Sequence, residues 1–294
     1  MKMLQKSLAK KYILITLFLS LASVLIIIII WYFGLTAWRQ QNDDSRRVAA
    51  QVQTPPPVNS VTTTRDSANI WAGYVATGQT FTSVEGKVKV PKISCTSDQD
   101  AFGAWVGFDG YGGGSTVEQA GISVTCDNTT AFNQAQPIDG ASYYAWGMMF
   151  GAGSSDFFDI TVRPDDVIYY KVSFENDTFA MEVDNLTLNQ SAKKAYSCEL
   201  NQVNLADNGG KPCPRYMAEW IVERPGNSSL ASFDGATLYD NKATAADGRT
   251  QYANSFDTVQ LDMVQAGTLL AETGKLQPRG SFTVLRRGHG VIGD

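Results

Sequence analysis

Residues 166–172 read DVIYYKV and residues 178–183 read TFAMEV, two short runs in which apolar and polar side chains largely alternate. A period of two is typical of a β-strand that turns one face toward a core. Similar runs recur at 84–90 and 281–285, and clusters of Gly, Asn, Asp and Ser separate them. The pattern predicts one all-β domain over residues 66–287, an antiparallel β-sandwich of the jelly-roll or concanavalin-like type.

No part of this region has the length and periodicity of a dominant helix. Residues 259–270 are compatible with a helix, but Gly267 and several β-branched residues make a strand at least as good an interpretation. The glycine run at 112–114 lacks the Lys-Ser/Thr ending of a phosphate-binding loop. We therefore expect it to form a hairpin turn and do not expect a nucleotide.

The N-terminal part contains an uncharged apolar run from Tyr12 to Phe33, YILITLFLSLASVLIIIIIWYF. At about 1.5 Å per residue this run can cross a hydrocarbon layer of about 30 Å. Four lysines precede it, so the positive-inside rule predicts a signal anchor at 12–33, a cytoplasmic N-terminus at 1–11 and an extracytoplasmic domain. The alternative is a cleaved signal peptide and a secreted protein, for which 35–37 is a weak cleavage site.

Two polar segments flank the predicted domain. Residues 34–65 contain three prolines at 55–57 and three threonines at 62–64 and lack apolar periodicity, which predicts an extended stalk. Residues 288–294 are predicted to be a flexible tail.

The net charge of −5 hides an uneven distribution. Residues 1–65 carry eight Lys or Arg and two Asp, a balance of +6, which leaves −11 for the remainder. An acidic domain repels phosphate backbones, so nucleic acid is not an expected partner. We expect contact with the membrane through 12–33, and a monomer.

The chain has a single histidine, His289, in the predicted tail. This excludes a zinc site built on several imidazoles and makes a Ser-His-Asp or Cys-His catalyst improbable on a flexible segment. No metal-ligand spacing is visible, and neither a metal nor a cofactor is expected. The remaining candidates for catalysis are carboxylates, amides and hydroxyls.

All four cysteines follow the apolar run, and no CxxC pair occurs. An even number in an extracytoplasmic domain favours disulfides. Three connectivities are possible. The one that closes the shortest local loops is preferred, and it joins Cys95 to Cys126 and Cys198 to Cys213.

Two predicted strands carry candidate catalytic side chains. In residues 218–223 (AEWIVE), the side chains of Glu219, Ile221 and Glu223 share one face, and in residues 117–124 those of Val117, Gln119 and Gly121 do so. A carboxylate among Trp and Ile is partly desolvated, which raises its pKa and suits it to exchange a proton with water. An ordinary strand with charges at its rim is the competing interpretation of these residues.

Six segments occur in order along nearly the whole domain: SANIWAGY (67–74), FTSVEG (81–86), AWVGFDG (104–110), EQAG (118–121), AW (145–146) and AEWIVE (218–223). Together they resemble the glutamic peptidase (eqolisin) family. The resemblance implies an acid endopeptidase built as a sandwich of two antiparallel sheets, which needs no metal or cofactor.

By this resemblance, Gln119 and Glu219 correspond to the catalytic pair of the family. Glu223, on the same face of the strand, is an alternative base, but the family pattern favours Glu219. The resemblance also implies that Trp105, Asp109, Trp71 and Trp146 contact substrate or support the pair near the family's cleft. A core aromatic is an equally good interpretation of Trp105. Glu118 points away from Gln119 and is expected to be an exposed charge.

The sequence departs from the family pattern in two places. After the cleft tryptophan the family usually continues with an aromatic residue, a glutamate and Tyr-Pro, whereas this chain reads Trp146-Gly147-Met148-Met149-Phe150. Met148 thus replaces a cleft carboxylate, which affects the substrate subsites and the pH optimum. The predicted membrane helix is the second departure.

The resulting hypothesis is a membrane-anchored extracytoplasmic endopeptidase acting at acidic pH, with Glu219 as general base and acid on water and Gln119 stabilising the oxyanion. The alternative is a non-catalytic carbohydrate- or peptide-binding sandwich, in which Trp71, Tyr74, Trp105 and Trp146 would stack on sugars. A purely structural surface domain is the third hypothesis.

Overall fold

The computed structural model of this protein describes residues 61–113, 116–127, 138–150, 155–198 and 213–288. Within these ranges the chain forms strands and two single-turn 3₁₀ helices, η3 (Ala253–Ser255) and η4 (Pro278–Gly280). The predicted all-β sandwich is therefore confirmed.

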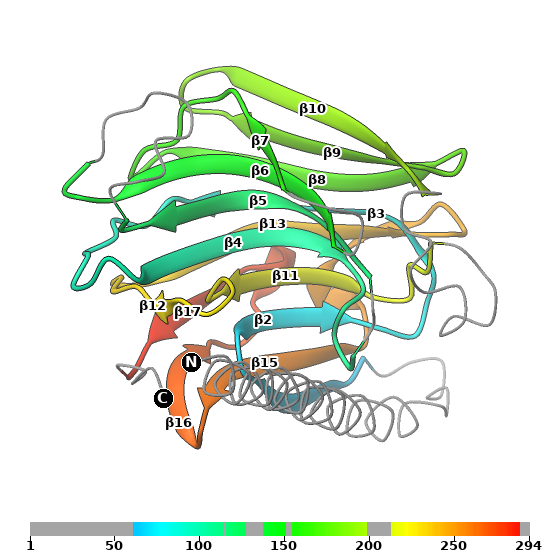
Figure 1. Ribbon diagram of the computed structural model, residues 1–294. Helices are drawn as coiled ribbons and strands as arrows, with labels where there is room; N and C mark the ends of the chain where they lie inside the picture. Colours follow the sequence, from blue (N-terminus) through cyan, green and yellow to red (C-terminus); the bar gives the residue numbers. More distant parts are fainter. Residues whose placement is uncertain (1–60, 114–115, 128–137, 151–154, 199–212, 289–294) are drawn as a thin grey trace, which may run out of the picture. The chain divides into compact units, whose positions relative to one another are not determined.

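One layer of the sandwich, the front sheet, contains eight strands and carries the candidate site. Its order is β7 (Asp156–Phe158), β6 (Ser142–Phe150), β5 (Val117–Thr125), β4 (Asp100–Phe108), β11 (Ala218–Glu223), β2 (Trp71–Ala76), β15 (Thr258–Gln265) and β1 (Thr63–Ala68). All neighbours are antiparallel except β15 and β1, which are parallel. Figure 1 shows β6, β5, β4, β11, β2 and β15 in this order.

The second layer, the back sheet, runs through β10 (Gln190–Ser197), β9 (Thr178–Asn185), β8 (Val167–Glu175), β3 (Phe81–Lys89) and β13 (Ala236–Ala245). Strands β14 (Thr250–Tyr252) and β17 (Phe282–Arg286) pair with β13. Strand β16 (Thr268–Thr273) pairs with both β17 and β15, so it joins the two sheets, and the short β12 (Ser229–Leu230) lies parallel to β4.

The core between the sheets follows from the alternation in the sequence. On β8, Ile168, Tyr170 and Val172 are fully buried, whereas the residues between them are only partly buried. From the front sheet, Trp220 enters the same core cluster and donates its indole N–H to the backbone carbonyl of Glu85 at 2.9 Å. The period of two therefore assigned the inward-facing residues of these strands correctly.

The segment 259–270 forms nearly all of β15 and the start of β16 rather than a helix. The fold also begins earlier than expected, because β1 starts at Thr63, inside the predicted stalk. The side chains of β1 are mostly polar and show no apolar alternation, so the sequence did not predict a strand there. The strand is held by backbone pairing to β15 and by a hydrogen bond of 3.0 Å between the hydroxyls of Thr63 and Thr258.

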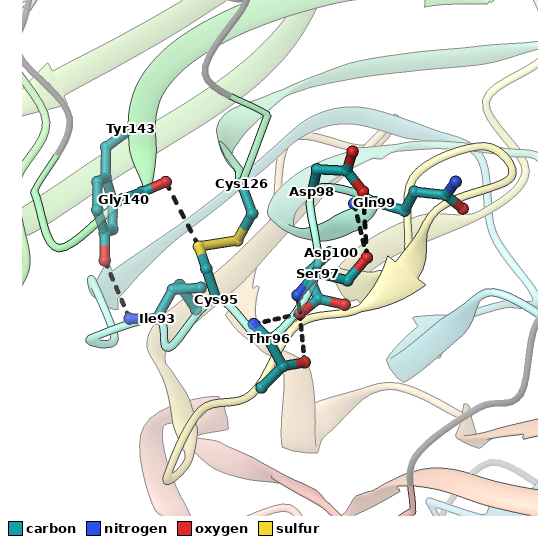
Figure 2. Close-up of a disulfide and its surroundings, with 10 residues drawn as sticks. All are labelled: Ile93, Cys95, Thr96, Ser97, Asp98, Gln99, Asp100, Cys126, Gly140 and Tyr143. Atoms are coloured by element: carbon teal, nitrogen blue, oxygen red, sulfur yellow. Dashed lines mark hydrogen bonds between the residues drawn. A yellow bond between two sulfur atoms is a disulfide. The ribbon is translucent and has the colours of Figure 1, made fainter.

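Both preferred disulfides are present: Cys95 pairs with Cys126 and Cys198 with Cys213. Figure 2 shows the first, which ties the segment before β4 to the residue after β5. Next to it, Asp100 accepts hydrogen bonds from the backbone N–H groups of Thr96 and Ser97, at 2.8 and 3.0 Å. These contacts fix the start of β4, the strand at the centre of the candidate site.

In the part of the chain that the structure describes, no helix combines the length and apolar character needed to cross a bilayer. The predicted span at 12–33 and N-terminus at 1–11 lie outside the described residues, as do His289 and the stalk up to residue 60.

Candidate active site

The two predicted catalytic side chains lie on one row across the front sheet. Gln119 on β5 is directly opposite Gly107 on β4, and Gly107 is directly opposite Glu219 on β11. Residues opposite each other in a ladder point to the same face. With strands about 4.8 Å apart, the two backbones are separated by about 9.6 Å, and both side chains project from the face turned away from the back sheet, here called the outer face.

Gly107 leaves the position between the pair without a side chain. A Cβ atom there would lie 2.7 Å from the backbone oxygen of Glu118, 3.1 Å from Cβ of Gln119 and 3.1 Å from the Trp105 ring. The site therefore requires glycine, and on this row no side chain stands between Gln119 and Glu219. The quoted motif contains Gly107, but nothing in the local sequence indicated this role.

Glu219 is fully buried, and only one of its two carboxyl oxygens has a hydrogen-bond partner. Its Oε1 accepts a hydrogen bond of 3.2 Å from the backbone N–H of Tyr111, and its Oε2 has no partner. Burial raises the pKa of the Glu219 carboxyl well above its usual range; the charge of Asp109 adds to the rise, and the bond from Tyr111 opposes it. An unpaired buried carboxyl oxygen is costly to a fold, which is why such groups mark functional sites.

Gln119 is almost fully buried, with 4% of its surface exposed, and its Oε1 lacks a hydrogen-bond partner. The amide therefore keeps hydrogen-bonding capacity that the described residues do not use. The structure thus brings Gln119 and Glu219 together as the sequence predicted.

Asp109 lies directly after β4, in a left-handed conformation with φ of 57°. Its Oδ1 accepts hydrogen bonds from the backbone N–H groups of Tyr216 and Met217, at 2.8 and 2.9 Å. Burial raises the pKa of Asp109 to about 7, although these two hydrogen bonds oppose the rise. Asp109 therefore anchors the segment before β11 and lies close enough to influence Glu219.

Glu223 lies on the outer face, two rows along β11 from Glu219 with Ile221 between them. Its Oε2 accepts a hydrogen bond of 2.6 Å from the indole N–H of Trp105, and burial raises its pKa while this bond opposes the rise. Trp105 is fully buried and packs edge-on against the half-buried Trp71, with ring centroids 5.2 Å apart. Glu223 therefore holds an aromatic pair and lies farther from Gln119 than Glu219 does.

Trp146 belongs to the same buried group on the outer face, together with Val75, Trp105, Val117, Ile221, Val259 and Leu261. We call this group the outer cluster. The Trp146 indole N–H donates to the hydroxyl of Ser123 at 2.8 Å. Met148 packs partly buried against the cluster directly opposite Gln119. An apolar thioether thus stands beside the amide.

Two predictions about single residues were wrong. Glu118 is fully buried and not exposed, because it lies on the inner face of a central strand, opposite Phe108 and Met149. Its charge raises the pKa of Arg215, which burial lowers. Tyr74, one of the proposed sugar-stacking residues, lies in the core between the sheets, where its hydroxyl donates to the carbonyl of Gly274 at 3.0 Å.

Two further residues of the site, Tyr111 and Asp66, were not predicted from the sequence. Tyr111 supplies the N–H that binds Glu219, and its hydroxyl donates to Asp66 on β1. Their link depends on strand order, which local sequence does not encode. Within the described ranges, no group of three or more His, Cys, Asp or Glu is arranged to hold a metal ion.

Known proteins resemble this chain in sequence and in fold. Residues 69–284 match the Peptidase A4 family. Aspergillopepsin-2 of Aspergillus niger is 28% identical over 273 residues, covering 81% of this chain and 89% of that protein.

Two solved structures share the fold. One is scytalido-glutamic peptidase with a peptide-based transition state analog, with a TM-score of 0.58 and 22% identity. The other is SCP-B, a member of the eqolisin family in complex with the tripeptide Ala-Ile-His, with a TM-score of 0.56 and 20% identity. Each comparison covers 76% of this chain and 100% of the other. Since the family match extends from the turn before β2 into β17, this chain belongs to the Peptidase A4 family and is a glutamic-type acid endopeptidase.

Proposed function

We propose that Glu219 and Gln119 are the catalytic pair of this endopeptidase. The observation that carries the proposal is the row Gln119, Gly107, Glu219, in which two buried polar side chains with unpartnered oxygens flank a position without a side chain. A scissile carbonyl in that gap would lie between a proton acceptor and an amide donor.

In the proposed reaction, the Glu219 carboxylate takes a proton from a water molecule while the water oxygen attacks the scissile carbonyl carbon. The carbonyl oxygen becomes an oxyanion, and the Gln119 amide N–H donates to it. The intermediate collapses as the C–N bond breaks, and Glu219 returns its proton to the departing amine. One oxyanion donor of this kind contributes about 3 kcal/mol of transition-state stabilisation.

Residues around the pair support this assignment. Burial raises the pKa of Glu219, so the carboxyl holds a proton to higher pH than an exposed glutamate does and can return it to the departing amine. The ionised fraction, which acts as the base, decreases as the pH falls. Asp109, Trp71, Trp105, Trp146 and Glu223 are proposed to position the pair or to contact substrate.

We propose polypeptides in extended conformation as substrates. The outer cluster offers apolar and aromatic contacts on both sides of the pair, with Met148 beside Gln119 and Val75 beside Glu219. Side chains on either side of the scissile bond would pack against these groups. We expect apolar residues to be favoured next to Met148, because a thioether offers no charge to a basic side chain.

The decisive experiment compares full-length chains purified in detergent on a denatured protein substrate between about pH 2 and 6. Glu219→Gln should lower kcat by about 10³-fold or more, because the amide cannot accept the proton. Glu182→Gln is the matched control, since Glu182 lies on β9 in a partly exposed ion pair with Lys193. Cleavage by Glu219→Gln at the rate of the control would overturn the proposal.

We further propose that residues 12–33 anchor the chain, with 1–11 in the cytoplasm, 34–62 as a stalk and the peptidase domain outside. The uncharged run and the four preceding lysines support this arrangement. Leu25→Arg should release the protein from membranes, because an arginine at the centre of a span costs about 3 kcal/mol. If washed membranes retain the Leu25→Arg variant as fully as the unmodified chain, the anchor is contradicted. If both the variant and the unmodified chain are released, a cleaved signal is indicated.

A further inference from the structure

Tyr111 connects two distant strands of the front sheet across its outer face. It follows β4, and its hydroxyl donates to Oδ2 of Asp66 on β1 at 2.5 Å. Strands β11, β2 and β15 lie between β4 and β1. The half-buried ring packs against the outer cluster, and Asp66 is directly opposite Leu261, a member of that cluster. The hydrogen bond therefore spans the part of the outer face next to Glu219.

The segment 109–111 is fixed on both sides of the group that binds Glu219. Asp109 holds one end through its two backbone hydrogen bonds, and the Tyr111 hydroxyl holds the other through Asp66. Between them Gly110 has φ of 107°, and a Cβ there would lie 2.5 Å from Val117 and 2.7 Å from the Trp71 ring. The backbone N–H of Tyr111 is thereby aimed at Oε1 of Glu219, 3.2 Å away.

Asp66 comes from a strand that the family match does not include. The matched region begins at residue 69, whereas β1 covers Thr63–Ala68. The bond between Tyr111 and Asp66 thus joins the site to a strand outside the residues that match the family.

We propose that Tyr111 and Asp66 are positioning residues of the peptidase reaction: their side-chain hydrogen bond holds the segment 109–111 so that the Tyr111 backbone N–H binds and orients the Glu219 carboxylate. This inference rests on the proposed role of Glu219 as the base. Neither side chain needs to touch the substrate, and β1 becomes a part of the active site.

The test uses full-length Tyr111→Phe and Asp66→Ala, with Tyr196→Phe as the matched control. Tyr196 makes the same kind of bond, from its hydroxyl to Asp156 at 2.8 Å, but its strand β10 belongs to the back sheet.

Each test variant should lower kcat about tenfold with KM within about twofold, as expected for the loss of one hydrogen bond to a charged group. The double variant should be no slower than the slower single variant, because both remove one bond. Asp66→Asn keeps an acceptor oxygen and should recover most of the activity.

The pH profile distinguishes positioning from general destabilisation. The Tyr111 N–H lowers the pKa of Glu219, whereas Asp109, Glu118 and Glu223 raise it together with burial. Loss of the bond between Tyr111 and Asp66 weakens the hydrogen bond from the Tyr111 N–H to Glu219, so the pKa of Glu219 should rise. The acidic limb of the plot of kcat against pH should therefore move to higher pH in both test variants. The control should leave this limb unchanged.

Three results would overturn the inference: unchanged kcat in Tyr111→Phe, an acidic limb that does not move, or additive effects in the double variant. These outcomes are separate from failure of the proposed function, which Glu219→Gln tests by itself. If Glu219→Gln is inactive while Tyr111→Phe equals the control, the catalytic pair stands and the positioning role is wrong.

Discussion

The two faces of strand β11 differ in how their polar atoms are satisfied. On the inner face, Ala218, Trp220 and Val222 are fully buried, and the Trp220 indole has its partner in the Glu85 carbonyl. On the outer face, Glu219 is equally buried but keeps an oxygen without a partner. The six residues of β11 thus present a packed apolar surface on one face and, on the other, an unpaired carboxyl oxygen that lowers the stability of the fold.

This difference separates stability from catalysis on a single strand. A fold gains nothing from a buried, unpaired carboxyl oxygen, whereas a reaction that moves a proton needs a free acceptor. We therefore expect inner-face substitutions to affect the free energy of unfolding and outer-face substitutions to affect turnover.

The largest effect is expected for Trp220→Ala on the inner face. Removing a fully buried indole leaves a cavity and should lower the free energy of unfolding by about 3–5 kcal/mol. Denaturant unfolding of the full chain measures this, with Phe150→Ala as the control because that ring is 53% exposed. A loss below about 1 kcal/mol would show that the inner face is not tightly packed.

The next largest effect is expected in how the free energy of unfolding depends on pH, through Asp109. Its pKa is raised from 3.8 when unfolded to about 7 in the fold, so the folded state holds a proton that the unfolded state has lost between these values. The resulting stabilisation is fully present below about pH 4 and is lost as the pH rises through about 7, by at most about 4 kcal/mol.

Asp109→Asn should flatten this dependence, because an amide keeps the acceptor oxygen for Tyr216 and Met217 and does not titrate. Some dependence should remain from Glu219, whose pKa is also raised. Unfolding measured at pH 4 and pH 7.5 tests this, with the exposed Asp98→Asn as the control. An unchanged difference between the two pH values would contradict the prediction.

Gln119→Ala on the outer face should lower kcat by about 10²–10³-fold, or about 3 kcal/mol, because the oxyanion loses its donor. The free energy of unfolding should fall by less than in Trp220→Ala, since Gln119 is the smaller side chain and its Oε1 has no hydrogen-bond partner to lose. Gln190→Ala is the control, because that amide accepts a hydrogen bond from Thr161 in a distant loop. A loss of stability without a loss of turnover would assign Gln119 to the core.

The smallest effect is expected for Gly107→Ala, which places a methyl group between the catalytic pair. Its close contacts with Glu118 and Gln119 should cost about 1–3 kcal/mol. Catalysis per folded molecule should also fall, because the methyl group occupies the position proposed for the scissile carbonyl. Gly103→Ala on the same strand is the control, since its nearest contacts are at 3.6 Å. Equal behaviour of the two variants would mean that the gap at 107 is not used.

Some features of the fold could be predicted because they depend on local pattern. Strands β8 and β9 follow directly from their alternation, and the shorter loops correctly indicated both disulfides. Strand β1 was missed because its stability comes from pairing with β15, nearly 200 residues later. A polar strand held by a distant partner has no local signal.

The candidate site was predicted in part, and by a different route. Alternation placed Glu219 and Glu223 on one face, but only the resemblance to glutamic peptidases singled out Gln119 and Glu219. Alternation also separated Glu118 from Gln119 correctly, yet the assumption that the other face meets solvent was wrong. Both faces of a central strand in a sandwich can be covered, and periodicity alone does not show by what.

The sequence by itself determined the all-β class, the alternation within each strand and the chemical types available for catalysis, because these depend on neighbouring residues and on composition. The tertiary structure alone decided that β11 lies between β4 and β2, that Gly107 separates the catalytic pair, and that Asp66 reaches Tyr111. Strand order and register arise from packing between segments that are far apart in the sequence, such as Asp66 and Tyr111 or Gly107 and Glu219, and no local pattern specifies them.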